Sequence, residues 1–372
     1  MRMVGKLCKM KTERLTQIEF SVMKNVFVIV LLLMSLRPAA ALYWDANSSA
    51  PGAGGSTPTG TWGVNAYWSA NADGTAPTQA WVSTNAAVFS AAMDATGTFT
   101  VNVSGTQTAV SLIFQEGHVT LAGGSLILSS AGGPVDVYPA TATINSVLTG
   151  STGLTKGSLG TLILTGANHY TGDTAVREGV LQLGASGVIP SNSRLVLTNL
   201  SAARATFATG GFSQSLGPLS VQGVDSTLQR VIDFGNGASA LSFADSSAED
   251  WNGMPLLIVN YTPGLDSLRF GTTSSGISPA QLALLQFADL GNASAQINAS
   301  GYVSPVLPSA PWIQLTWSTA DNRTYRVEYK DNLEDLTWTP VVPDVLALAT
   351  TASTIDTSAG AAKRFYRVEV LP

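Results

Sequence analysis

Cysteine and histidine are almost missing from this chain of 372 residues. It holds one cysteine, Cys8, and two histidines, His118 and His169. A single thiol cannot form an internal disulfide, so backbone hydrogen bonds and packing must stabilise the fold. Two distant histidines and no cysteine pair give no metal-ligand set of the usual spacing, and little material for a Ser-His-Asp triad.

Charged residues are also scarce. They make up 12% of the chain, against 45% hydrophobic residues and 36 glycines. The apolar content excludes a disordered chain, and the shortage of Glu, Lys and Leu excludes a mainly helical one. Short β-prone runs alternate with Gly, Asn, Asp and Thr along most of the sequence. The composition therefore predicts an all-β protein.

The N-terminus carries the pattern of a targeting segment. An apolar run at 26–34 follows Lys24 and precedes three alanines at 39–41. A short apolar core with a basic flank and small residues before the cleavage point predicts a signal peptide over 1–41. The run is too short to span a membrane, which takes about 20 residues. The segment before Met23 is unusually long and polar for the start of a signal peptide. We therefore expect translation to begin at Met23.

Cleavage after Ala41 changes the charge of the protein. Residues 1–41 hold seven of the 19 basic and two of the 24 acidic residues, so the mature chain keeps 12 basic and 22 acidic residues, a net charge of −10. An acidic surface repels phosphate, so nucleic acid is not an expected partner. Cys8 is also removed. We expect no membrane span in the mature chain, and contact with the export machinery only during secretion.

Residues 42–86 are rich in tryptophan and glycine. Trp62, Trp68 and Trp81 stand out here as candidate ligand-stacking residues, because exposed aromatic rings in an exported protein can stack on sugars. The alternative is that they plug the open end of a β-structure, whose bare edges would otherwise aggregate. We favour the second interpretation and predict an N-terminal cap.

Residues 87–304 consist of short alternating strands. The run at 98–103 alternates polar and apolar residues, and runs of about five residues follow at 110–114, 117–121 and 124–128. No helix-length periodicity separates them, so corners rather than crossover helices must connect the strands. Such spacing suits either a sandwich or a β-helix.

The segment 153–184 distinguishes between these folds. It reads Gly-Leu-Thr-Lys, then Gly-Thr-Leu-Ile-Leu-Thr-Gly-Ala-Asn, then Tyr-Thr-Gly-Asp-Thr, then Gly-Val-Leu-Gln-Leu-Gly. This closely resembles the autotransporter-associated β-strand repeat of bacterial passenger proteins. The resemblance implies a right-handed parallel β-helix. At roughly 20–30 residues per rung, the region would form about seven to eleven rungs.

The C-terminal part changes in composition. A capping-box pattern at Ser278–Gln281 first predicts a helix that continues to Phe287 and covers an edge of the β-helix. Three prolines then mark a linker at 305–311. Amphipathic strands with Trp and Tyr follow in 312–372, which resembles a small fibronectin type III-like antiparallel β-sandwich.

Residues for catalysis are sparse. β-Helices also occur in polysaccharide lyases and hydrolases, and hydrolases need paired carboxylates at working distance. Asp173 and Glu178 lie in one repeat, and Asp245 with Glu249 and Asp250 forms the densest acidic group, a weak candidate for Ca²⁺. Solvated loop carboxylates explain both groups better. The sequence therefore indicates no catalytic residue, no cofactor and no metal site.

These features together predict an exported, non-catalytic structural and adhesive protein, either secreted or associated with the cell surface and outer membrane. Its expected partners are extracellular macromolecules or polysaccharide. A carbohydrate-binding protein that uses Trp62 and Trp68 is the alternative. A polysaccharide lyase or hydrolase of the β-helix type is the third interpretation.

Overall fold

The computed structural model describes residues 40–199, 203–307, 312–320, 322–348, 350–358 and 363–372. The predicted signal peptide lies almost wholly outside these residues, so its prediction is not tested. Strand β1 begins at Ala41, and cleavage after Ala41 would leave Leu42–Trp44 of that strand in the mature chain. In the described residues, no helix is long and apolar enough to cross a membrane.

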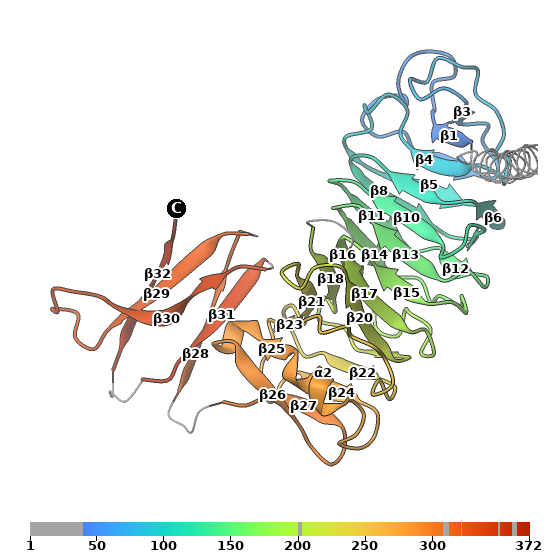
Figure 1. Ribbon diagram of the computed structural model, residues 1–372. Helices are drawn as coiled ribbons and strands as arrows, with labels where there is room; N and C mark the ends of the chain where they lie inside the picture. Colours follow the sequence, from blue (N-terminus) through green and yellow to red (C-terminus); the bar gives the residue numbers. More distant parts are fainter. Residues whose placement is uncertain (1–39, 200–202, 308–311, 321, 349, 359–362) are drawn as a thin grey trace, which may run out of the picture. The chain divides into compact units, whose positions relative to one another are not determined.

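The fold is all-β, as predicted, and its main part is a parallel β-helix of about eight turns (Figure 1). One side is a nine-stranded sheet, in which only the short β3 (Trp68–Ser69) runs antiparallel. Its parallel strands are β1 (Ala41–Trp44), β4 (Ala86–Phe89), β7 (Leu112–Phe114), β10 (Pro134–Val137), β13 (Leu154–Gly157), β15 (Thr174–Val176), β17 (Leu195–Asn199) and β20 (Leu219–Gly223).

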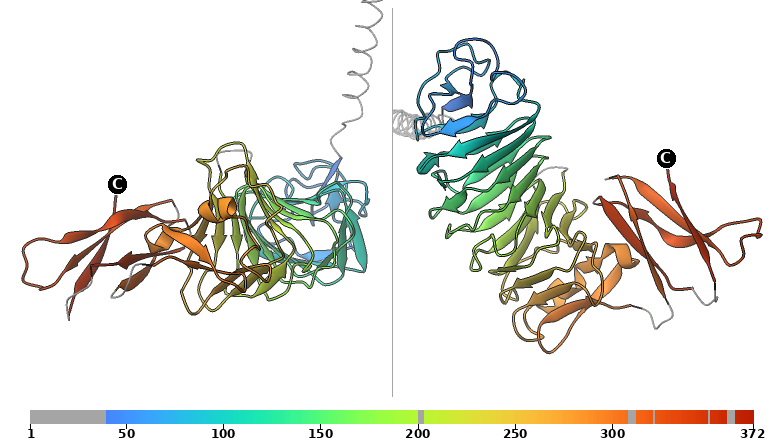
Figure 2. Two further views of the ribbon diagram at one scale, coloured as in Figure 1. Left: turned by 60° about the horizontal axis from the view of Figure 1, so that its bottom comes forward. Right: turned by 180° about the vertical axis from the view of Figure 1, so that it is seen from behind.

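A 15-stranded sheet forms the second side and continues around the C-terminal end of the β-helix. We call the part from β2 to β25, in which neighbouring strands are parallel, sheet B. The strands of sheet B are β2 (Gly60–Trp62), β5 (Thr98–Val103), β8 (His118–Ala122), β11 (Thr141–Ile144), β14 (Thr161–Leu164), β16 (Gly179–Leu183), β18 (Ala205–Ala208), β21 (Arg230–Asp233), β23 (Leu256–Val259) and β25 (Leu285–Phe287). Successive strands lie side by side along the stack (Figure 2).

Shorter strands supply the third side. In the first half these are β6 (Thr106–Ala109), β9 (Ser125–Leu128) and β12 (Val147–Thr149), and in the second half β19 (Gln214–Leu216), β22 (Ala240–Phe243) and β24 (Ser267–Phe270). Antiparallel pairs then close the end through β26 (Ala293–Ile297) and β27 (Tyr302–Pro305).

An aliphatic column fills the interior because alternate residues of each strand point inward. Leu162 of β14 lies directly beside Leu181 of β16, and both are fully buried. Each such leucine contributes about 1.5–3 kcal/mol by leaving water. Aromatic residues stack in the same way: the Phe89 and Phe114 rings lie 4.7 Å apart at an interplanar angle of 10°. Stacking between rungs is thus what holds the fold together.

Polar corner residues join the rungs. The buried Asn168 accepts a hydrogen bond from the Leu148 backbone N–H at 2.8 Å and donates to the Val188 carbonyl at 2.9 Å. One amide therefore connects three successive rungs. At the start of β16, Gly179 has φ +66°, and a Cβ there would lie 2.5 Å from the Gly160 carbonyl oxygen. Only glycine fits this close approach.

The predicted helix is present but shorter than expected. Helix α2 (Pro279–Ala283) begins with the complete capping box of Ser278 and Gln281. The predicted continuation to Phe287 is wrong, because Leu285–Phe287 forms strand β25 beside β23. Leu285 and Phe287 are buried there, so packing against the neighbouring rung overrides the helical pattern. A short 3₁₀ turn, η1 (Ala288–Leu290), follows.

Antiparallel sheets make up the C-terminal region. Strands β28 (Ile313–Ser318) and β31 (Thr351–Asp356) form one sheet, and β30 (Thr339–Leu346), β29 (Thr324–Lys330) and β32 (Phe365–Val370) form the other. Tyr325, Val345, Ala347 and Ala352 form a small core with Trp317. The specific likeness to fibronectin type III domains stays a prediction.

Candidate functional site

The candidate stacking tryptophans lie inside an aromatic cluster. Trp62 and Trp68 have 0% exposure, and their rings meet edge-on at 5.3 Å. Trp81 is half-buried and donates its indole N–H to the Thr108 carbonyl at 2.8 Å. Trp44 and Phe89 complete the contacts around Trp68. Buried rings cannot stack on a ligand, so this geometry corrects the stacking role for Trp62 and Trp68. It fits the alternative interpretation, a plug over the core.

The other sequence candidates are placed apart or in structural pairs. His169 is exposed in the loop between β14 and β15, and His118 is exposed on β8. Asp173 pairs with Arg194 at 2.6 Å and lies before β15, whereas Glu178 follows that strand. Arg194 also pairs with Glu249 at 3.3 Å. Within the described ranges, no three His, Cys, Asp or Glu side chains are grouped so that they could hold a metal ion.

The outward side of sheet B carries two rows of threonines. In the first row Thr98, His118, Thr141 and Thr161 are successive neighbours on β5, β8, β11 and β14. In the second row the neighbours are Thr100, Thr120, Thr143 and Ile163. We call these two rows, eight residues over four rungs, the threonine face.

Thr98 is exposed, and the other five threonines of this face are partly exposed. None makes a side-chain hydrogen bond with another residue in the described part of the chain. Threonines elsewhere in the β-helix behave differently: Thr152 donates to the Leu128 carbonyl at 2.6 Å, and Thr209 donates to the Phe234 carbonyl at 2.6 Å. The face also carries no acidic or basic side chain apart from the imidazole of His118. Apart from His118 and Ile163, it is an array of hydroxyl and methyl groups on one side of the sheet.

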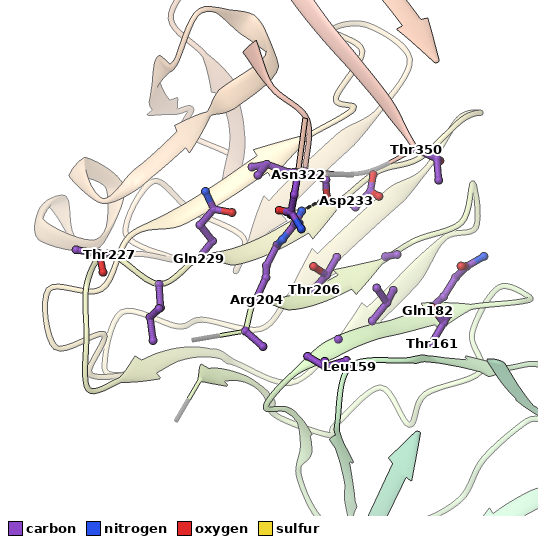
Figure 3. Close-up of a pocket in the computed structure, with 16 residues that line it drawn as sticks. Leu159, Thr161, Gln182, Arg204, Thr206, Thr227, Gln229, Asp233, Asn322 and Thr350 are labelled. Atoms are coloured by element: carbon purple, nitrogen blue, oxygen red, sulfur yellow. Dashed lines mark hydrogen bonds between the residues drawn. The ribbon is translucent and has the colours of Figure 1, made fainter. Parts of the chain in front are cut away.

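Further along sheet B the same rows enter a groove of about 610 Å³ (Figure 3). The first row continues as Val180 and Thr206, and the second as Gln182, Ala208 and Asp233. The opposite wall comes from the C-terminal region. The full lining is Leu159, Thr161, Gly179, Val180, Gln182, Ala203, Arg204, Thr206, Ala208, Thr227, Leu228, Gln229, Asp233, Asn322, Leu348 and Thr350.

Both charged groups of the groove serve the structure. Arg204 donates to the Leu348 carbonyl and, at 2.9 Å, to Oδ1 of Asn322. Oδ1 of Asp233 accepts hydrogen bonds from the Gly235 N–H at 2.8 Å and from Nδ2 of Asn260 at 2.7 Å. What the groove offers a ligand is therefore mainly hydroxyl, amide and small apolar groups.

A polar network beside the groove joins the two regions of the chain. Oδ2 of Asp289 accepts from the Asn260 N–H at 2.6 Å, and Thr351 donates to Oδ1 of Asn260 at 2.7 Å. Burial, together with the nearby Asp233 carboxylate, raises the pKa of Asp289 to about 7, against the lowering effect of the hydrogen bond from the Asn260 N–H. Leu348 adds an apolar contact with Val231 and Val259 of sheet B.

Lys156 is a fully buried lysine in β13 of the β-helix. Its Nζ donates to three carbonyls, at 2.7 Å to Gly157, 2.6 Å to Ser158 and 3.2 Å to Glu178. Burial lowers its pKa to about 7, against the opposing effect of the Asp136 and Glu178 carboxylates. The ammonium ties one rung to the corner of the next, so its role is structural.

Sequence reasoning missed the threonine face. The signal is present in Thr98-Phe99-Thr100 and Thr141-Ala142-Thr143, where every second residue carries a hydroxyl. Alternation alone shows that these side chains share one side of a strand. That the strands stack in register depends on the lengths of the corners between them, which the sequence pattern does not specify.

Comparison with known proteins identifies one part of the chain. Residues 154–183 match the family model described as passenger-associated-transport-repeat. Over 172 residues the chain is 36% identical to "Adhesin BmaC autotransporter" of Brucella suis biovar 1 (strain 1330). That match covers 46% of this chain and 5% of the relative, so the chain spans a small part of that protein's length. No solved structure matches. The chain thus carries the predicted autotransporter passenger repeat.

Proposed function

We propose that the chain is an exported, non-catalytic adhesive protein that is presented on, or released from, a bacterial surface. The observation that carries the proposal is the passenger repeat at 154–183, which is built into the β-helix as strands β13 to β16. The name of the similar adhesin supports the adhesive role. A long ladder of short rungs presents a large, repetitive surface, which suits attachment better than turnover of a small substrate.

The chemistry of the groove supports binding rather than hydrolysis. Glycosidases place two carboxyl groups on either side of the bond they cleave. Asp233 is the carboxylate that lines this groove, and it already accepts two hydrogen bonds from the fold. Release of reducing or unsaturated sugar ends by the purified protein from a polysaccharide panel would contradict the non-catalytic part of the proposal.

Export is tested by fractionating the native cells and sequencing the N-terminus of the mature chain. We expect the protein in the extracellular or surface fraction, beginning at Leu42. A variant with a charge in the apolar run, Leu32→Lys, is the control and should stay in the cytoplasm. A cytoplasmic, uncleaved wild-type protein would contradict the proposal.

Adhesion is tested by comparing native cells with a strain from which this gene is deleted. The deletion strain should attach more weakly to the surfaces that the organism colonises, and beads coated with purified protein should attach where the cells do. Equal attachment of both strains, with no attachment of coated beads, would contradict the adhesive role.

A further inference from the structure

We propose that the threonine face and the adjoining groove bind a neutral, linear polysaccharide that lies along the stack of rungs. This inference rests on the proposed adhesive function and names the class of ligand. It also moves carbohydrate binding from the buried Trp62 and Trp68 to an open side of the β-helix.

The repeat of the face selects a repeating ligand. Each rung adds one residue to each row, and neighbouring rungs lie about 4.8 Å apart. The rows then continue into the groove through Thr206 and Gln182 without a break in register. A small molecule would contact one or two rungs, whereas a linear polymer along the axis can contact all of them. The geometry therefore fits a chain of identical units.

The chemistry of the face selects a neutral, hydroxylated ligand. Hydroxyl groups without internal partners can both donate and accept hydrogen bonds, as sugar hydroxyls do. Thr120 and Thr143 lie at the centre of the face, and both are partly exposed. No lysine or arginine in the two rows could pair with an anionic polymer, and the net acidic charge of the chain repels one.

An exposed aromatic ring and a second hollow lie at the edge of the face. Tyr138, in the corner that leads to β11, is 47% exposed. Its ring can stack on the apolar side of a sugar, a contact that the buried tryptophans cannot make. Beside it, a shallow hollow of about 450 Å³ is lined by His118, Thr141 and the corner residues Pro139 and Gly160, among others.

The test measures the affinity of the processed full-length chain for neutral soluble polysaccharides (galactomannan, xyloglucan and dextran) and for the anionic alginate and polygalacturonate. Affinity electrophoresis and titration calorimetry serve as readouts. The variant Thr120→Val with Thr143→Val removes two hydroxyls while the β-branched shape is kept. We expect it to bind about ten- to thirtyfold more weakly, the effect of losing two hydrogen bonds of ordinary strength.

The matched control carries the same change on another side of the β-helix, Thr106→Val with Thr108→Val in β6. Its affinity should stay within about twofold of that of the wild type. Neither threonine belongs to the threonine face, so no hydrogen bond to the ligand is lost. Far-UV circular dichroism and thermal melting establish that both variants are folded.

Four results would each overturn the proposal. They are no binding to any neutral polysaccharide, binding to the anionic ones alone, equal weakening by both double variants, and binding to a protein partner with no effect of the face variant. If cells still export the protein and attach through it while these assays fail, the ligand class is wrong and the adhesive function stands. If the polysaccharide assays succeed and the protein is cytoplasmic, the ligand class stands and the adhesive function is wrong.

Discussion

At the scale of single residues, the buried polar groups show how the rungs are joined. A lysine inside a wall of backbone carbonyls is unfavourable unless all its donors are used, and Lys156 uses three. Asn168 joins three rungs by accepting one hydrogen bond at its amide oxygen and donating one from its amide nitrogen. Both residues belong to the passenger repeat, so the motif is explained by the acceptors and donors that its corners must satisfy.

The lysine can be tested by substitution. Lys156→Met keeps much of the side-chain volume but leaves its three carbonyl acceptors without the ammonium. We expect a loss of about 2–4 kcal/mol in the free energy of unfolding, measured by urea denaturation. Lys363→Met is the matched control, because Lys363 is exposed and contacts only the Phe365 ring among the interactions described. Equal effects of the two substitutions would contradict the role given to Lys156.

Asp289 gives a pH-dependent prediction. Because burial raises its pKa to about 7 in the folded protein, against 3.8 as the ordinary value, folding favours the protonated acid. The stability that it contributes is fully present below about pH 3.8, and it is lost as the pH rises through about 7. Asp289→Asn, which stays neutral, should remove part of the decline in stability between these values.

Thermal melting of both proteins across pH 4–8 tests this prediction. The Asp233 carboxylate and the Asn260 N–H face Asp289 and are unchanged in the variant. Parallel pH profiles for wild type and Asp289→Asn would show that Asp289 does not titrate in this range.

The tryptophans show what residue types alone could not reveal. By composition Trp62 and Trp68 suit both a sugar platform and a hydrophobic plug, of which the sequence favours the plug. Only the position of the β-helix end, where uncovered apolar residues must be shielded, separates the two roles. Their complete burial is a property of the assembled cap and not of its amino-acid content.

At the scale of elements, strands were predicted better than their connections. The alternation in 98–103 and the repeat at 153–184 indicate strands at the observed places. Strand β15 at Thr174–Val176 has no recognisable signal in the sequence. Its three residues are too few for a recognisable period and are set by pairing with β13 and β17.

The aliphatic column can be tested by comparing two leucines of one rung, one inside a strand and one in the corner before it. Leu162→Ala in β14 deletes a fully buried side chain and should cost about 2–5 kcal/mol of stability. Leu159→Ala, three positions earlier, removes the same atoms from a side chain that is 59% exposed and should cost less than about 0.5 kcal/mol. Urea denaturation followed by circular dichroism compares them. A larger effect at Leu159 would mean that the inward and outward sides are assigned wrongly.

At the scale of the whole molecule, the parallel β-helix and the antiparallel C-terminal sheets agree with the sequence interpretation. The groove between sheet B and the C-terminal residues could not be predicted, since its walls are more than a hundred positions apart in the chain. Arg204 and Asn322, whose side chains meet there, have no local pattern that indicates their contact. The ligand-binding surface thus depends on tertiary arrangement far more than the strands do.

The in-register stacking of the rungs is the claim on which the threonine face and its proposed ligand both depend. It can be measured by placing cysteine pairs in the processed chain, which lacks a cysteine once residues 1–41 are removed. A thiol-specific reagent that bridges one rung spacing, about 4.8 Å, should join Thr120→Cys to Thr143→Cys, which are direct neighbours on β8 and β11. It should leave Thr120→Cys unlinked to Thr161→Cys, two rungs away. Linkage of the distant pair, or none in the adjacent pair of a folded variant, would contradict the account.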